Sequence, residues 1–189
     1  MRKLKLQMNM SLDGFVAGPN GESDWIWIGK PDPAGLQKVI ELAESCDTIL
    51  LGRKMTAEFV KHWEGIVDKH PDSHEQSLAH LMVNMRKIVF SRTQTALTGR
   101  NLEVENGDLI TAVQALKEQP GKDIVVYGGA DFVSSLISHN LIDEYYIIIN
   151  PVAIGKGLSI FKEQKVLELQ STIIFTNGKI WNKYVPVGM

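Results

Sequence analysis

The sequence predicts an α/β fold whose mostly parallel sheet finishes in an antiparallel hairpin. Short apolar runs that suit buried strands alternate with helix-like patterns along the chain. Three of these runs end in glycine, or in serine, directly before a helix or loop, as strands do at the ligand-binding edge of parallel sheets. Near the end of the chain, Asn177-Gly178 separates two strand-like segments and favours a type I′ turn, which needs positive φ at both positions.

Residues 3–13 form the first predicted strand, because apolar and polar side chains alternate there. One face carries Leu4, Leu6, Met8, Met10 and Leu12, and the other carries Lys5, Gln7, Asn9, Ser11 and Asp13. A strand covered on both faces is usually apolar throughout, so the polar face indicates either a strand beside a cleft or an edge strand. We favour the cleft, at the Asn9–Asp13 end, and keep the edge strand as the alternative.

The helices and the remaining strands follow in order. Leu36, Val39, Ile40 and Ala43 recur at helical spacing after Pro33, which suits a helix start. The further predicted elements are a strand over 48–52, helices over 53–62 and 74–85, a strand over 87–91, a helix from its cap Asp108 to about Glu118, a strand over 123–127, a helix to about Ser138, a central strand over 145–152, and hairpin strands over 171–175 and 179–185.

The composition is that of an ordinary globular protein. The 189 residues are 44% hydrophobic and 22% charged, with a net charge of −2, which favours neither nucleic acid nor membrane. No linker or repeat divides the chain, so we expect one domain over residues 1–189. The single cysteine, Cys46, excludes an internal disulfide and a cysteine-rich zinc site and suits the core. The histidines show no metal-ligand spacing, and without a long apolar stretch we expect a cytoplasmic protein.

Three strand ends carry residues suited to phosphate. They are Leu51-Gly52-Arg53, Phe90-Ser91-Arg92 and Tyr127-Gly128-Gly129. Glycine lets a phosphate approach the backbone, a helix N-terminus offers free N–H groups, and arginine forms paired hydrogen bonds to phosphate. Taken singly, Gly128-Gly129 is better read as a tight turn, and Arg53 can be a solvated surface charge. At successive strand ends the three junctions together indicate a nucleotide site, although the Gly-x-Gly-x-x-Gly of common Rossmann folds is absent.

Six segments occur in an order found in one known superfamily. They are Met10-Ser-Leu-Asp-Gly-Phe-Val-Ala17, Leu51-Gly-Arg-Lys-Met-Thr56, Lys87-Ile-Val-Phe-Ser-Arg-Thr93, Val126-Tyr-Gly-Gly-Ala130, Leu141-Ile-Asp-Glu144, and Pro151-Val-Ala-Ile-Gly-Lys-Gly157 with Phe161. In these segments the chain resembles the dihydrofolate reductase-like superfamily. Within it, the chain is similar to a stand-alone member of the riboflavin biosynthesis reductase family, the RibD C-terminal domain. The resemblance implies a three-layer α/β/α sandwich with a mixed, mostly parallel sheet.

The resemblance also implies NADPH as the cofactor and indicates which residues hold it. Arg53, Ser91 and Arg92 would surround the 2′-phosphate of the adenosine, which favours NADPH over NADH. Residues 128–132 would hold the pyrophosphate and nicotinamide side, with a cis peptide at Gly128-Gly129. The implied set is Gly52, Arg53, Lys54, Met55, Thr56, Ser91, Arg92, Thr93, Gly128, Gly129, Ala130, Asp131 and Phe132.

Two departures from the family pattern bear on the site. Many relatives carry threonine two positions after the arginine of the first loop, whereas here Thr56 comes three positions after Arg53. The pattern therefore does not fix which residue caps the phosphate. Gly35 stands about where dihydrofolate reductases place the acidic residue that grips the pterin, and the nearest acid is Asp32. Because glycine cannot hold a protonated pterin, efficient dihydrofolate reduction is not expected.

Asn9, Ser11, Asp13 and Trp25 are the candidate residues on the substrate side. Asp13 is the candidate for substrate hydrogen bonding or proton delivery, with a cap of the Gly14 turn as the slightly favoured alternative. Trp25 suits either stacking on a planar substrate or packing over its own loop.

The function expected from these features is that of an NADPH-dependent oxidoreductase without a metal. It would transfer a hydride to a C=N or C=O carbon of a small heterocyclic or ribosylaminopyrimidine-like substrate. The alternatives are a non-catalytic or regulatory NADP-binding protein and a dihydrofolate reductase with weak activity. The family resemblance and the apolar 145–152 segment predict a homodimer, with no nucleic acid or membrane partner.

Overall fold

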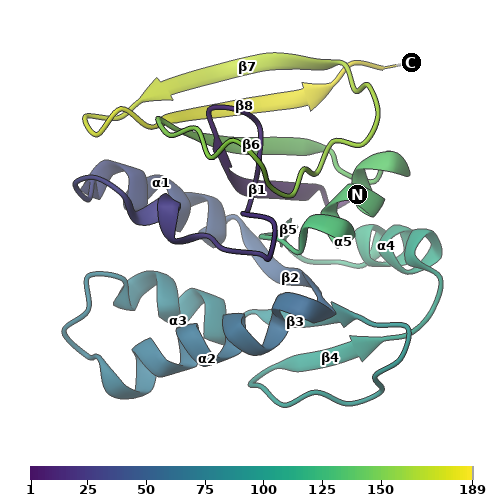
Figure 1. Cartoon of the computed structure of the whole chain (residues 1–189). Coiled ribbons are helices and arrows are strands. Elements are labelled where there is room, and N and C mark those ends of the chain that lie inside the picture. Colours follow the sequence, from purple (N-terminus) through teal and green to yellow (C-terminus); the bar gives the residue numbers. More distant parts are fainter. Residues whose placement is uncertain (189) are drawn as a thin grey trace.

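The computed structural model describes residues 1–188 and shows one eight-stranded mixed sheet with helices packed around it (Figure 1). The predicted α/β fold class is confirmed. In chain order the elements are β1 (Leu4–Ser11), η1 (Asp24–Trp27), α1 (Pro33–Glu44), β2 (Cys46–Gly52), α2 (Arg53–Lys69), α3 (Gln76–Asn84), β3 (Arg86–Phe90), β4 (Leu102–Glu105), α4 (Leu109–Glu118), β5 (Asp123–Val126), α5 (Ala130–Ser138), β6 (Glu144–Asn150), β7 (Leu167–Ile174) and β8 (Ile180–Pro186).

The strand order β4-β3-β2-β5-β1-β6-β8-β7 puts the first strand inside the sheet. The strands from β4 to β6 run parallel, and β8 and β7 then pair antiparallel, as predicted. β1 lies between β5 and β6, with Leu4 opposite Ile124 and Leu6 opposite Tyr145. The edge-strand alternative for β1 is therefore wrong.

The polar face of β1 is occupied by an ion pair at one end and borders a cleft further along. Lys5 is buried, and its ammonium pairs with the Asp123 carboxylate at 2.8 Å. Gln7 and Asn9 line a large cleft, so the polar face does lie beside a cleft. The lining segment of β1 is 7–9 rather than the predicted 9–13 end, since the strand stops at Ser11.

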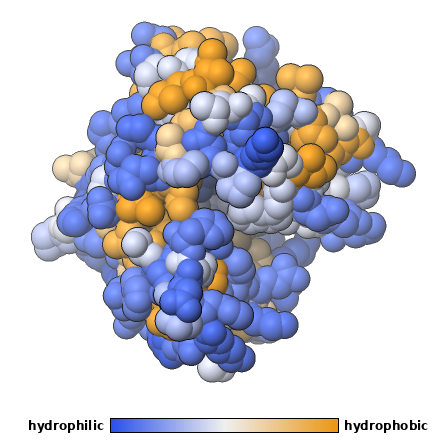
Figure 2. All heavy atoms as spheres, turned by 90° about the vertical axis from the view of Figure 1, so that its left-hand side faces the viewer, coloured by the Kyte–Doolittle hydropathy of each residue, from blue (hydrophilic) through white to orange (hydrophobic). Residues whose placement is uncertain are grey.

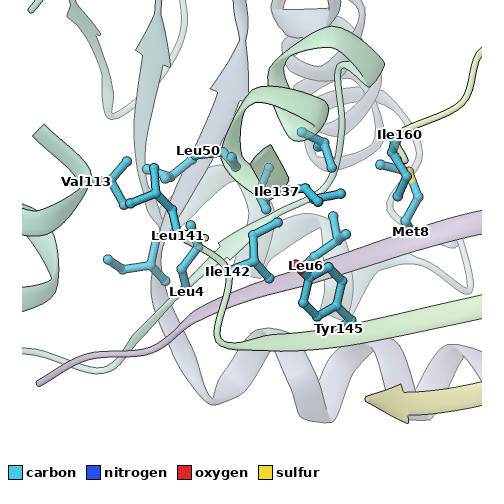
Figure 3. Packing of buried hydrophobic residues seen from close by; sticks show 14 of the residues in the cluster. Leu4, Leu6, Met8, Leu50, Val113, Ile137, Leu141, Ile142, Tyr145 and Ile160 are labelled. Atoms are coloured by element: carbon cyan, nitrogen blue, oxygen red, sulfur yellow. The ribbon is translucent and has the colours of Figure 1, made fainter. Parts of the chain in front are cut away.

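Three apolar clusters join the sheet to the helices, and two of them are large. On one face, α4 and α5 pack on β1 and β5, and Leu6, Val113 and Ile137 belong to this cluster (Figure 3). On the other face, α1, α2 and α3 pack on β2 and β3, and Ile49 and Met82 are almost fully buried in this cluster. Buried apolar surface stabilises a fold by roughly 25 cal/mol per Å², so these clusters hold the strands in register.

The C-terminal hairpin is present as predicted, but its turn is not type I′. Gly178 has φ +82°, whereas Asn177 is not among the residues of positive φ in the described chain. The N–H of Gly178 donates to the carbonyl of Phe175 at 3.0 Å, so the turn spans 175–178. Phe175 is buried, and Thr176 donates its N–H and hydroxyl to Asp32 Oδ2 at 2.9 and 2.6 Å. These tertiary contacts set the turn geometry, which the local dipeptide does not encode.

The apolar segment predicted as a central strand is β6, which pairs with β1 and β8. Its apolar side chains are explained by burial inside this sheet, so they give no argument for a homodimer, which stays a prediction. Exposed apolar side chains occur instead on the edge strand β7, at Leu169 and Ile174. Figure 2 shows separate hydrophobic patches on one face of the molecule, including one at the top, over the hairpin. Within residues 1–188, no helix has the length and apolar character needed to cross a bilayer.

Candidate functional site

A cleft of about 1350 Å³ opens beyond the carboxyl ends of β2, β3 and β5 and alongside β1. These strands are parallel, and β3, β2, β5 and β1 are consecutive in the sheet, so their carboxyl ends meet at one edge. Pockets for drug-sized ligands measure roughly 300–1,000 Å³. The cleft therefore has room for a ligand larger than these, such as a dinucleotide with a second molecule beside it.

The cleft has two parts, which come from different segments. The part here called the cofactor half, after the predicted cofactor residues, is lined by residues within 52–58, 90–93, 105–110 and 128–139, and contains every residue of that predicted set except Thr56. Thr56 is 1% exposed, and its hydroxyl donates to the Gly52 carbonyl at 3.2 Å, inside the first turn of α2. The other part, here called the substrate half after the predicted substrate residue Asn9, is lined by 7–9, by residues within 16–26, and by Leu158.

The junction of β2 and α2 brings a helix N-terminus to the cleft. Gly52 is the N-cap residue, and no side chain caps the first turn, so its N–H groups are available to a ligand. A Cβ on Gly52 would lie 2.8 Å from the Cβ of Phe132, so only glycine allows α2 and α5 to come this close. Arg53, Lys54 and Met55 follow on the lining surface.

The junction of β5 and α5 is built on Gly128 and Gly129, whose φ angles are +155° and +86°. A Cβ on Gly129 would approach Gly52 Cα and Phe132 Cβ to 3.4 Å. The expected cis peptide between these glycines is wrong, since no cis peptide occurs in residues 1–188. Positive φ at both residues turns the chain while the peptide stays trans. α5 then begins with no side-chain cap, so a second set of N–H groups is available at the cleft.

The loop after β3 supplies the third junction. Ser91 is 7% exposed, and its hydroxyl oxygen accepts from the N–H groups of Thr93 and Gln94 at 3.3 and 2.9 Å. Ser91 therefore orders the loop that carries the exposed Arg92.

The cofactor half carries both signs of charge, with Arg53, Lys54 and Arg92 as basic residues and Glu58, Glu105, Asp108 and Asp131 as acidic ones. Asp108 caps α4 through the N–H of Thr111 at 2.9 Å, and Glu105 accepts from the Gly107 N–H at 2.6 Å. Backbone N–H groups thus satisfy these two carboxylates. Lys54 pairs with Asp131, whereas the guanidinium groups of Arg53 and Arg92 form no ion pair within residues 1–188.

Asp13 does not line the cleft. Its carboxylate accepts from the N–H groups of Ile154 and Gly155, the latter at 2.7 Å, and from the Ser11 hydroxyl at 2.6 Å. The Ser11 hydrogen bond and the two backbone N–H groups hold the pKa of Asp13 below its ordinary value. These contacts join the loop after β1 to the loop after β6, which is a structural role.

Ser11 and Trp25, two further substrate candidates, also lie outside the cleft lining. Ser11 is fully buried, and its hydroxyl oxygen also accepts from the Phe15 N–H at 2.9 Å. Trp25 is 6% exposed, and its indole N–H donates to the Glu22 carbonyl at 3.3 Å, so its ring packs within its own loop. Asn9 is the one predicted substrate residue that lines the cleft.

Several lining residues carry no signal in the sequence. The loop from Val16 to Ile26 has no periodic pattern, and the sequence marks Asp108 only as a helix cap.

Asp32, the acid nearest to Gly35, caps α1 through Ala34 N–H and binds the hairpin turn at Thr176. Neither Asp32 nor Gly35 lines the cleft. No cluster of metal-ligating side chains occurs in the described part of the chain.

A sheet of this order, with anion-suited junctions at adjacent strand ends, is that of the dihydrofolate reductase-like α/β proteins. The chain belongs to the RibD C-terminal domain family, whose model matches residues 2–180.

Relatives and solved structures agree with this family. The chain is 34% identical to the uncharacterized protein YyaP of Bacillus subtilis over 190 residues, which covers 96% of each. A putative riboflavin biosynthesis protein from Shewanella sp. PV-4 shares the fold with a TM-score of 0.74 at 18% identity, over 100% of both chains. A Thermotoga maritima protein described as a diaminohydroxyphosphoribosylaminopyrimidine deaminase/5-amino-6-(5-phosphoribosylamino)uracil reductase has a TM-score of 0.69 at 19% identity. The match covers 98% of this chain and 57% of that one.

Proposed function

We propose that this protein is an NADPH-dependent reductase acting on a C=N or C=O bond of a small heterocyclic, ribosylaminopyrimidine-like substrate. The observation that carries the proposal is the cofactor half of the cleft. There, two uncapped helix N-termini meet two arginines that form no ion pair within the described chain, at adjacent strand ends. The family and the reductase named among the solved structures support it.

The cofactor half offers contacts for the pyrophosphate and the 2′-phosphate of NADPH. The N–H groups at the start of α2 and α5 suit the pyrophosphate, because a helix N-terminus carries partial positive charge. Arg53 and Arg92 suit the 2′-phosphate, which accepts paired hydrogen bonds from a guanidinium. When bound, NADPH supplies a hydride from C4 of its nicotinamide.

In this proposal the chain acts mainly by orienting two reactants, with no acid or base from its own side chains. Among residues 1–188, those that line the substrate half include no Asp, Glu, His, Lys or Arg. Tyr127 also lines the cleft, but its hydroxyl is buried, and burial raises the pKa of this phenol well above its usual value. The proton that joins the reduced nitrogen or oxygen therefore comes from water, and catalysis rests on proximity and on the exclusion of competing geometries.

A screen of NADPH consumption tests the proposal. The purified chain is mixed with NADPH and a panel of aminopyrimidines, pterins and their ribosyl derivatives, and loss of NADPH absorbance is followed. Turnover on a pyrimidine or related heterocycle is expected. Tight NADPH binding with no turnover on any member would instead favour the non-catalytic binding protein. Turnover on dihydropterins alone would favour the dihydrofolate reductase alternative. The structure argues against that alternative, because the hairpin residue Thr176 already donates two hydrogen bonds to Asp32, the acid nearest to Gly35.

A further inference from the structure

The substrate half of the cleft contains no charged side chain, and one of its amides has a fixed orientation. From this we infer that the site takes an uncharged molecule that presents a carbonyl oxygen or ring nitrogen to Asn9, and selects against phosphorylated forms. The inference rests on the proposed function for the identity of this half as the substrate site.

No residue of the described chain that lines the substrate half carries a charge. Its polar members are the neutral Gln7, Asn9, Asn20 and Ser23. The two acids of the same loop, Glu22 and Asp24, do not line the cleft, and Glu22 accepts from the N–H and amide group of Asn20 at 2.9 and 2.7 Å. The basic lining residues all lie in the cofactor half.

The ammonium of Lys179 approaches this region from the hairpin but is already engaged. It donates to the Ile26 carbonyl at 2.7 Å, and Lys179 does not line the cleft. A phosphate or carboxylate removed from water needs a cation or several donors to offset its desolvation. The substrate half supplies no cation, so a charged ligand would be penalised there while a neutral one would not.

Asn150 fixes the orientation of the Asn9 amide. Asn150 is 1% exposed, and its Nδ2 donates to the backbone carbonyls of Met10 and Ile148 at 3.3 and 3.2 Å. Carbonyl oxygens only accept, so the nitrogen of the Asn150 amide must face them. The same Nδ2 lies 3.2 Å from Asn9 Oδ1, so its two N–H groups are shared among three acceptors, of which the Asn9 oxygen is one.

The Asn9 amide therefore faces Asn150 with its oxygen and keeps its Nδ2 donor for a ligand. Within residues 1–188 this Nδ2 donates to no protein group, and Asn9 lines the cleft. A donor at this place pairs with an acceptor atom, such as the carbonyl oxygen of a pyrimidine ring. Asn9 would contact the substrate directly, and Asn150 is a positioning residue that acts through it.

Binding rather than turnover is the primary test, so that its outcome does not depend on the proposed reaction. Calorimetric titration of the NADP⁺-saturated protein compares 5-amino-6-ribosylaminouracil with its 5′-phosphate. The neutral compound is expected to bind at least about 10-fold more tightly, which corresponds to about 1.4 kcal/mol. Tighter binding of the phosphate, equal binding, or no binding of either compound would overturn the inference. Binding of the neutral compound without NADPH oxidation would uphold the inference and remove the proposed function.

Variants separate the two parts of the inference. Asn9→Asp replaces the donor with an acceptor and is expected to weaken binding of the neutral compound at least about 10-fold, with NADP⁺ affinity unchanged. Ser23→Lys adds a cation at an exposed lining position that makes no side-chain cap, and should raise affinity for the 5′-phosphate. An unchanged preference in Ser23→Lys, or full binding in Asn9→Asp, would contradict the assignment.

Asn150→Ser tests the positioning role by comparing two affinities, which a general loss of stability would lower together. Binding of the neutral compound should weaken while NADP⁺ affinity is retained, as in Asn9→Asp. The double variant Asn9→Asp with Asn150→Ser should then lose little more than Asn9→Asp alone, because both changes remove the same donor. Additive losses would show that Asn150 does not act through Asn9.

Discussion

Lys54 in the first turn of α2 and Asp131 in the first turn of α5 form an ion pair with Nζ and Oδ2 2.9 Å apart. The pair joins the two helix N-termini that line the cofactor half. Both side chains are more than 70% exposed, at 76% and 74%, so the pair adds little to stability. Both residues line the cleft where we propose that the NADPH phosphates bind, so removing either one changes the charge there.

Substitutions in this pair should change NADPH affinity in opposite directions. Lys54→Met removes a cation and leaves Asp131 unopposed, so NADPH should bind several-fold less tightly, with a larger loss at low salt. Asp131→Asn removes the anion and should tighten binding. Fluorescence titration at two salt concentrations measures both, and thermal melts should show little change. Weaker binding in both variants would mean that the pair acts through its geometry.

Arg53 and Arg92 should determine the preference for NADPH over NADH. Arg53→Ala and Arg92→Ala each remove proposed charge-assisted hydrogen bonds to the 2′-phosphate. Each should therefore weaken NADPH binding at least about 10-fold, or about 1.4 kcal/mol. NADH lacks this phosphate and should bind the variants as it binds the parent. If both variants bind NADPH as tightly as the parent, the phosphate lies elsewhere.

Gly129→Ala should impair both folding and the cofactor site. The residue has φ +86°, and a Cβ there would approach Gly52 Cα and Phe132 Cβ to 3.4 Å. Gly155 is the matched control, because it has φ +77° with no atom within 4 Å of the added Cβ. Backbone strain of the order of 1–3 kcal/mol should appear in both variants. Only Gly129→Ala should also lose NADPH affinity, which denaturant melts and titration together would show.

Asp13→Ala should lower thermal stability with little effect on turnover. The carboxylate anchors the loop at Ile154 and Gly155 and is absent from the cleft lining. Once a substrate is known, kcat should stay within about threefold of the parent under conditions where the variant is folded, since less than about 1 kcal/mol of transition-state stabilisation is then involved. A loss of kcat of about a hundredfold or more would restore Asp13 to the catalytic role that the sequence suggested.

Glu144 should give the fold a characteristic loss of stability in acid. Burial alone would raise its pKa, but hydrogen bonds from Lys3, Tyr146 and Lys183 outweigh burial and lower the pKa from 4.5 to about 2. The folded state thus binds the proton less readily than the unfolded chain. The stabilisation is complete above the unfolded pKa and is lost as pH falls through the folded value, and we expect roughly 3 kcal/mol at neutral pH.

Denaturant melts of the parent and of Glu144→Gln across pH measure this contribution. The difference in free energy of unfolding should be full at neutral pH, shrink below the unfolded pKa, and vanish near the folded pKa. A difference that stays constant over this pH range would show that the charge of the Glu144 carboxylate does not stabilise the folded state.

The fold could be predicted from the sequence where local pattern and tertiary burial agree. The spacing of Leu36, Val39, Ile40 and Ala43 predicts α1, and the cap Asp108 predicts the start of α4. β4 was not predicted, because Leu102–Glu105 is short and its residues are half-buried or exposed. α2 extends to Lys69, beyond the predicted end at 62, because its apolar contacts continue through Ile66.

The sequence could predict that the three junctions come together because each is local in sequence, and all of the predicted cofactor residues except Thr56 line one cleft. The substrate half could not be predicted, because it depends on contacts between distant segments. Asn150 orients Asn9 across two strands, and nothing near either residue in the sequence signals this. Asp13 and Trp25 carry suggestive chemistry, but Gly155 and Glu22 already engage them, which only the tertiary structure reveals.

The position of β1 within the sheet has a consequence for folding kinetics. Leu4 pairs with Ile124 and Leu6 with Tyr145, so the first strand to be synthesised pairs with strands that are synthesised much later. Loop closure over such separations is entropically costly, and high contact order slows folding. On the ribosome, β1 has no strand to pair with until β5 and β6 emerge. Stopped-flow refolding should accordingly show a slow step to which substitutions in β1, β5 and β6 contribute most.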